Sequence, residues 1–199
     1  AAKMAGRLKA LGFEVTTGVG GTGVVGIMKN GAGPTVMLRT EFDALPVEER
    51  TGLPYASKAT GKNPAGETVP VMHACGHDVH MTAWVGAATT LANDKKSWHG
   101  TLMMVGQPAE EIGGGAEAML ADGLFTRFPK PDFVLAIHDS DSLASGRVGI
   151  KGGPLLAGAD SVDIVVYGKG GHGARPHRTI DPIVIAAKII LSLQTIVSR

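Results

Sequence analysis

The chain has 199 residues, of which 44% are hydrophobic and 19% are charged, and its formal net charge is +1. This composition is typical of a soluble globular protein, and the small charge gives no general attraction for nucleic acid, an anionic membrane or acidic substrates. Apolar runs are too short to cross a bilayer. A single cysteine excludes an internal disulfide framework and favours a reducing, cytoplasmic compartment.

Apolar periodicity and turn residues predict an alternation of strands and helices. In chain order, we expect a helix over residues 2–11, strands over 24–28 and 35–39, an irregular stretch over 48–70, a helix over 78–93, a strand over 101–106, a short helix over 115–122 and a buried strand over 133–137. This order indicates an α/β fold, with a mixed sheet covered by helices on both faces.

A glycine-rich segment, Gly18 to Gly23, matches the dinucleotide-binding pattern GxGxxG. That pattern binds a pyrophosphate only where it follows a strand and opens a helix. Here it is expected to follow a helix and lead into a strand. We therefore interpret it as a turn.

The character of the sequence changes after residue 156. Residues 161–168 alternate like a half-exposed strand, and Asp181 and Pro182 are typical of the N-cap and first position of a long apolar helix. We predict a catalytic domain over residues 1–156 and the beginning of a smaller α+β domain over 157–199. Because one strand and one helix cannot bury their apolar faces, and residue 1 is not methionine, we expect a piece of a longer protein.

The segment from His73 to His80 concentrates groups that bind metals: one cysteine, three histidines and an aspartate. Thiolate and imidazole are preferred ligands of zinc, and imidazole also suits manganese, cobalt and nickel. Cys75 and His77 flank a single glycine at the start of a helix, whose dipole would favour a thiolate. Two alternatives remain: a buried structural cysteine with histidines that cap the helix, or Cys75 as an acyl-forming nucleophile.

Other metal-capable side chains follow predicted strands. Glu110 and Glu111 come after the strand over 101–106, His138 follows 133–137, and Asp43 follows 35–39. Strand ends of open α/β sheets are where sites form. Adjacent carboxylates diverge, so one can bind metal while the other acts on water.

A further glycine-rich segment surrounds His172, which could stabilise charge on a reacting carbonyl. Taken by itself, the segment is more typical of a surface turn.

Taken together, these motifs resemble the M20 metallopeptidase family. The resemblance is closest to its branch of hippurate hydrolases, N-acyl-amino-acid amidohydrolases and plant auxin-conjugate hydrolases. The matching segments occur in the family's order and span nearly the whole chain; they are 39–46, 73–78, 107–111, 137–138 and 171–177.

The resemblance implies specific roles. Cys75, His77, Glu111 and His138 would bind two divalent ions (manganese, zinc, cobalt or nickel), with Glu110 as general base. Asp43 would lie beside the metals, and His172 would act in the partner subunit's active site or position substrate. The second domain would be a ferredoxin-like lid that forms a homodimer.

The implied reaction is metal-dependent hydrolysis of the amide bond of N-acyl amino acids such as hippurate. Glu41 stands where this branch usually has aspartate, and a further histidine ligand that the family supplies after the lid is not in this chain. The alternatives are a dipeptidase or another aminoacylase of the family, or a non-catalytic metal-binding or dimerisation fragment.

Overall fold

The computed structural model describes residues 1–63, 65–158 and 160–198. It comprises two compact units, one formed by Ala1–Ser145 and the other beginning at Gly146. The division after residue 156 that the sequence suggests stays a prediction.

A five-stranded mixed sheet lies at the centre of the first unit, with strand order β1-β2-β6-β3-β7. The strands are β1 (Glu14–Val19), β2 (Gly23–Asn30), β3 (Thr35–Glu41), β6 (Gly100–Gln107) and β7 (Phe133–Leu135). β2 is antiparallel to both β1 and β6, whereas β3 is parallel to both β6 and β7. The carboxyl ends of β3, β6 and β7 therefore meet at one edge of the sheet.

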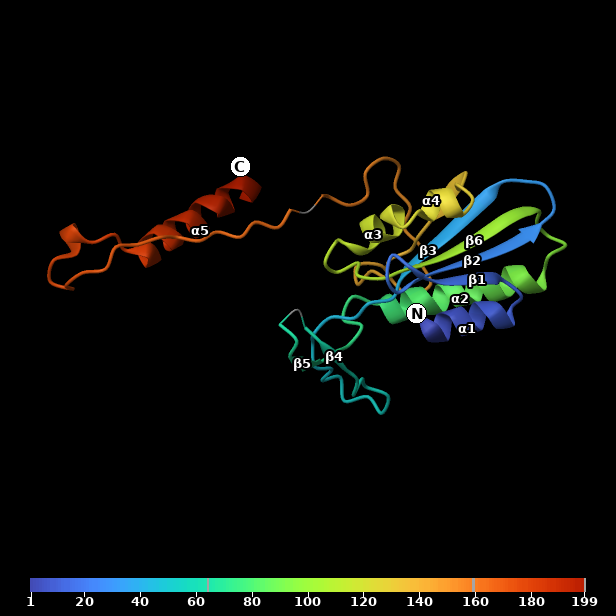
Figure 1. Cartoon of the computed structure of the whole chain (residues 1–199), viewed down its shortest axis with the longest axis horizontal. Helices are drawn as coiled ribbons and strands as arrows, with labels where there is room; N and C mark the ends of the chain where they lie inside the picture. The colour runs from blue at the N-terminus through green and yellow to red at the C-terminus, as the bar shows by residue number, and fades with distance from the viewer. Residues whose placement is uncertain (64, 159, 199) are drawn as a thin grey trace. The chain divides into compact units, whose positions relative to one another are not determined.

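Helices cover both faces of this sheet, which confirms the predicted α/β fold (Figure 1). On one face lie α1 (Ala2–Ala10) and α2 (His77–Asn93), and on the other lie α3 (Gly115–Ala121) and α4 (Leu124–Arg127). All but the short α4 were expected from the sequence, with bounds within one residue or two.

Alternating side chains of β6 build the two hydrophobic cores. Leu102 and Met104 join the core under α1 and α2, while Met103 and Val105 join the core under α3 and α4. Each such side chain stabilises the fold by about 1.5–3 kcal/mol when fully buried. Trp84 of α2 packs in the first core, and its indole N–H donates to the carbonyl oxygen of Leu38 at 2.9 Å. This bond fixes α2 against β3.

The glycine-rich segment Gly18–Gly23 is indeed a turn, but its context differs from the expected one. It begins within the end of strand β1, which the sequence did not predict, turns at residues 20–22 and ends at the first residue of the antiparallel strand β2. Because it does not open a helix, it lacks the helix N-terminus that would bind a pyrophosphate. The interpretation as a turn is therefore confirmed: the segment leads into a strand as expected, although a strand and not a helix comes before it.

Two other expectations need correction. The stretch 48–70 is mostly irregular but contains a small antiparallel ribbon, formed by β4 (Thr60–Lys62) and β5 (Thr68–Pro70). The strand at 133–137 is shorter than predicted and is not buried. Its side chains, Phe133 to Leu135, are 55–61% exposed, because β7 is the last strand of the sheet.

The second unit contains a 3₁₀ turn (Pro176–Arg178) and the long helix α5 (Pro182–Ser198). Asp181 caps α5 as expected: its Oδ1 accepts the backbone N–H groups of Ile183 at 2.9 Å and Val184 at 3.3 Å. The predicted strand over 161–168 is wrong, since those residues have no regular structure. Among the helices described in the two units, none combines the length and apolarity needed to cross a membrane.

Candidate metal centre

Four segments of the first unit meet at the edge where β3, β6 and β7 end. Asp43 follows β3, Glu110 and Glu111 follow β6, and His138 follows β7. The fourth segment carries Cys75 immediately before α2. Because the three strands are parallel to one another, the fold itself brings these chain segments to a common place.

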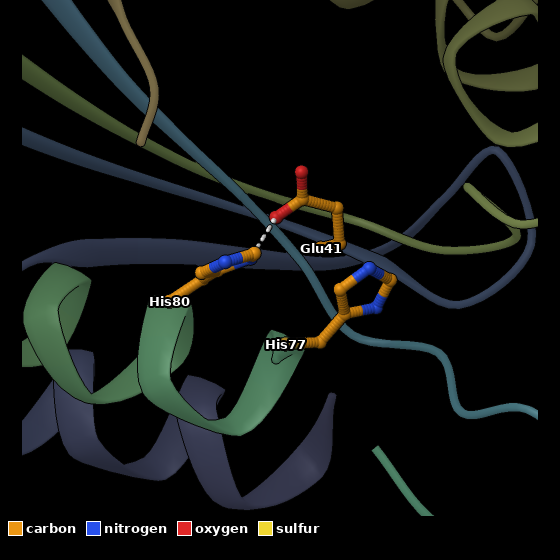
Figure 2. Close-up of side chains that lie close together, drawn as sticks. All are labelled: Glu41, His77 and His80. Atoms are coloured by element: carbon orange, nitrogen blue, oxygen red, sulfur yellow. Dashed lines mark hydrogen bonds and ion pairs between the residues drawn. The ribbon is translucent and has the colours of Figure 1, made fainter. Parts of the chain in front are cut away.

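Gly76 makes the sharp entry into α2. Its φ of 72° lies in the left-handed region, which a residue without Cβ adopts at little cost. Its carbonyl oxygen accepts the first helical hydrogen bond, from the N–H of His80 at 3.0 Å. As a result, His77 and His80 project from the first turns of α2 toward Glu41 at the end of β3 (Figure 2).

The ring of His77 is buried and held in one orientation. Its Nδ1 lies 3.0 Å from the carbonyl oxygen of Asp43, which can only accept, so Nδ1 carries the proton. The lone pair of Nε2 then points to Glu110 and Glu111, each of which has a carboxylate oxygen 3.7 Å away. Nε2 is buried without a hydrogen-bond partner among the described residues. Such an atom normally costs about 1–3 kcal/mol, and a metal ion would satisfy it.

Cys75 lies on the other side of the same cluster. Its Sγ is 3.4 Å from Nε2 of His138, and ligand atoms of Cys75, His77 and Glu111 all lie within 4.8 Å of one another. Burial, together with the negative charges of Glu111 and Glu110, raises the pKa of the Cys75 thiol. These effects outweigh the lowering of the Cys75 pKa that was expected from the dipole of α2. A raised pKa disfavours a free thiolate nucleophile, whereas a divalent cation would stabilise the thiolate.

The two adjacent glutamates differ in their surroundings. Glu111 belongs to the cluster with Cys75 and His77, and its side chain is 20% exposed. Glu110 is 38% exposed and therefore more accessible to water. The turn that separates them from β6 contains Ala109, which has a φ of 49°. A positive φ is uncommon for a residue other than glycine, and backbone of this kind often occurs at functional sites.

Asp43 connects the segments to one another. Its carboxylate Oδ2 accepts the backbone N–H of Glu111 at 3.0 Å, and its Oδ1 lies 3.3 Å from Nδ1 of His77. It thus lies beside the cluster and orients two of its members, while its predicted place beside bound metal ions stays a prediction.

Sequence reasoning missed a second set of polar residues next to this cluster. His80 is 1% exposed and lies between Glu41 and Asp139, with nitrogen–oxygen distances of 3.3 Å and 3.0 Å. The signal was present, because His77 and His80 are three residues apart and therefore on one side of a helix. The structure thus brings together the predicted site residues Cys75, His77, Glu110, Glu111, His138 and Asp43. It adds Glu41, His80 and Asp139, which the sequence analysis did not assign to the site.

His172 lies in the second unit. Its Nδ1 accepts the backbone N–H of Ala174 at 3.1 Å in an exposed loop. Its predicted action on substrate stays a prediction.

The cluster in the first unit fits a metal centre by its chemistry. It offers one thiol, two imidazoles and two carboxylates, a donor set that suits zinc, manganese, cobalt or nickel. The unpartnered Nε2 of His77 points into this set, as expected of a metal ligand.

Comparison with known proteins agrees with this geometry. The model of peptidase family M20/M25/M40 matches residues 37–194. The chain is 43% identical over 193 residues to N-acetyl-L-cysteine deacetylase of Bacillus subtilis, covering 96% of the chain and 44% of that protein. It is also 43% identical over 197 residues to hippurate hydrolase of Campylobacter jejuni, covering 98% of the chain and 48% of that protein. The chain thus spans about half the length of these relatives.

One similar solved structure is that of a metal-binding protein. It is a dinuclear metal-binding peptidase of the M20 family from Bacillus subtilis, 33% identical, with a TM-score of 0.67. The match covers 77% of this chain and 40% of that one. The matched family model and these relatives show that the chain belongs to peptidase family M20/M25/M40.

Proposed function

We propose that the protein is a metal-dependent amidohydrolase that cleaves the amide bond of N-acyl amino acids, of which hippurate is an example. The observation that carries this proposal is the buried, unpartnered Nε2 of His77, which points to two carboxylates beside the Cys75 thiol. The two curated relatives support it, because N-acetylcysteine and hippurate are both amino acids with an acyl group on nitrogen.

Four side chains of the first unit would hold two divalent ions: Cys75, His77, Glu111 and His138. When bound, the ions polarise the substrate carbonyl and lower the pKa of a water molecule toward ~7. Asp43 supports this site by fixing the ring of His77 and the backbone of Glu111. The identity of the metal is left open among manganese, zinc, cobalt and nickel.

Glu110 is the proposed general base because it is the more exposed carboxylate of the pair. It removes a proton from the water molecule as the water oxygen bonds to the carbonyl carbon. The carbon–nitrogen bond then breaks, and Glu110 returns the proton to the leaving nitrogen. The products are a carboxylic acid and a free amino acid, so Glu110 is regenerated and no other reactant is needed.

The remaining parts of the proposal rest on the family resemblance. His172 would stabilise the negative charge that develops on the carbonyl oxygen, and the second unit would form a homodimer. We also propose a cytoplasmic location, which the single cysteine in this sequence favours. A dipeptide, offered beside hippurate and N-acetyl amino acids, would separate an amidohydrolase from a dipeptidase of the family by its relative kcat/KM.

The first test replaces Glu110 by glutamine in the full-length protein. Glu110→Gln removes the proton acceptor but keeps the shape of the side chain, so hydrolysis of N-acyl amino acids should fall by about 10²- to 10⁴-fold. Metal content, measured by mass spectrometry of the elements, should stay at the wild-type value because Glu110 is not a proposed ligand.

The matched control is Glu117→Gln, the same change at an exposed position of α3. It should leave turnover and metal content unchanged. Wild-type turnover in Glu110→Gln would contradict its role as general base, and a loss of metal in that variant would instead place Glu110 among the ligands.

A further inference from the structure

The proposed ligand His138 lies on a weakly supported part of the chain. β7 before it has three residues and pairs only with β3. The side chain of Ile137 is 54% exposed, that of His138 is 51% exposed, and residues 136–139 have no regular secondary structure. A metal ligand needs a fixed ring orientation. Contacts outside the sheet must therefore place this imidazole.

Asp139, the next residue, provides one such contact. Its carbonyl oxygen lies 2.8 Å from Nδ1 of His138, and because a carbonyl only accepts, Nδ1 carries the proton. Nε2 of His138 is then left with its lone pair, and this nitrogen lies 3.4 Å from Sγ of Cys75. The carboxylate Oδ1 of Asp139 lies 3.2 Å from the same Nδ1, so the backbone and the side chain of Asp139 together select the tautomer that a metal ligand requires.

His80 fixes Asp139 in turn. Nε2 of His80 either accepts the backbone N–H of Asp139 at 2.9 Å or, when it carries the proton, donates to Oδ1 of Asp139 at 3.0 Å. The rings of His80 and His138 also pack edge to face, with centroids 4.5 Å apart. Gly76 leaves room for this arrangement, because a Cβ there would lie 2.3 Å from Oδ1 of Asp139.

His80 itself is anchored in the sheet. Its Nδ1 lies 3.3 Å from Oε2 of Glu41, which is 3% exposed, as the dashed line in Figure 2 marks. Glu41 forms an ion pair with Arg39, whose guanidinium donates to Oε1 of Gln107 at 2.7 Å and 3.0 Å. A continuous polar chain therefore runs from β6 through β3 and α2 to Asp139.

We propose that Asp139, held by His80, is a positioning residue that fixes His138 against Cys75. This inference rests on the proposed function for the role of His138 as a ligand. It assigns to the Asp139 carboxylate the placement of one ligand.

The test is a titration of metal-free full-length protein with Co²⁺, followed by its visible absorption bands. Asp139→Ala is suitable because this side chain is 48% exposed, so its loss leaves no buried cavity. We expect Co²⁺ affinity at one of two sites to fall by about 10- to 100-fold, with altered ligand-field bands. Asp139→Asn keeps a polar atom beside Nε2 of His80 and should restore most of the affinity. Asp141→Asn, in the same segment, is the control and should match the wild type.

His138→Ala serves as the reference that separates this inference from the proposed function. If His138→Ala weakens one site and Asp139→Ala binds Co²⁺ like the wild type, the positioning role is wrong and the ligand assignment stands. An equal loss in Asp141→Asn would also overturn the positioning role. If His138→Ala binds two ions with wild-type affinity, the ligand assignment itself fails, and the positioning role fails with it.

Discussion

At the scale of single residues, the site depends on a glycine between two proposed ligands. Gly76 combines a φ of 72° with a position where a Cβ would lie 2.3 Å from the Asp139 carboxylate. Gly76→Ala should therefore destabilise the protein by about 1–3 kcal/mol. It should also weaken metal binding, because Asp139 must move. Urea unfolding and metal titration of the full-length variant would measure both effects.

The same helix offers a matched control at Gly86. This glycine lies in the middle of α2, and a Cβ there would meet no atom within 4 Å. Gly86→Ala should stabilise the protein by about 0.5–1 kcal/mol and leave metal binding unchanged. Equal stability changes of the same sign in the two variants would contradict a special role for Gly76.

The proposed metal ligands could be found from the sequence because their residue types are distinctive. Cys75 and His77 flank one glycine, and Glu110 and Glu111 follow an apolar strand. The polar chain behind them could not be found in this way. Glu41, His80 and Asp139 come from three separate segments, which are brought together by the pairing of β3 with β7 and the packing of α2 against β3.

At the scale of elements, prediction succeeded where apolar periodicity was strong. It failed where the pairing of a segment with a neighbouring strand decided whether that segment formed a strand and how far it was buried. β1 was missed because its alternation is weak: Thr16 and Thr17 stand in its middle, and most of it is not buried. The alternating residues 161–168 do not form a strand, since alternation alone cannot supply a neighbouring strand. An apolar run likewise does not tell an edge strand from a central one, as the exposure of β7 shows.

A pH-dependent contact joins the β1–β2 turn to α3. The backbone N–H of Gly20 donates to Oδ2 of Asp122 at 3.0 Å, and this bond, with help from Arg127, lowers the pKa of Asp122 below its ordinary value of 3.8. The stability it contributes is therefore present above pH 3.8 and is lost as pH falls through the lowered native value. Because Asp122 is exposed, the effect should be small.

Asp122→Asn tests this contact. The variant should be slightly less stable than the wild type near pH 7. The difference should shrink as the pH falls below 3.8 and through the lowered native pKa, because the wild-type carboxyl then becomes neutral, as the asparagine amide is at every pH. Urea unfolding at several pH values measures it. A difference that stays constant across this range would show that the charge of Asp122 is not responsible.

At the scale of the whole molecule, the first unit gathers the proposed ligands, and the second unit carries an apolar helix. Several side chains of α5 are half-exposed or more, among them Ile183, Leu191 and Ile196. Such a surface is typical of a helix that packs against another element. The chain spans about half the length of its curated relatives, so functional tests belong on the full-length protein.

The central claim is that the cluster around Cys75 and His77 works by binding metal. It is tested most directly by the rate of N-acyl amino acid hydrolysis before chelation, after chelation and after metal is added back, with the metal content measured at each step. We predict two bound ions at the start, loss of activity as they are removed, and recovery when manganese, zinc, cobalt or nickel is restored. Unchanged hydrolysis by protein without detectable metal would contradict the claim.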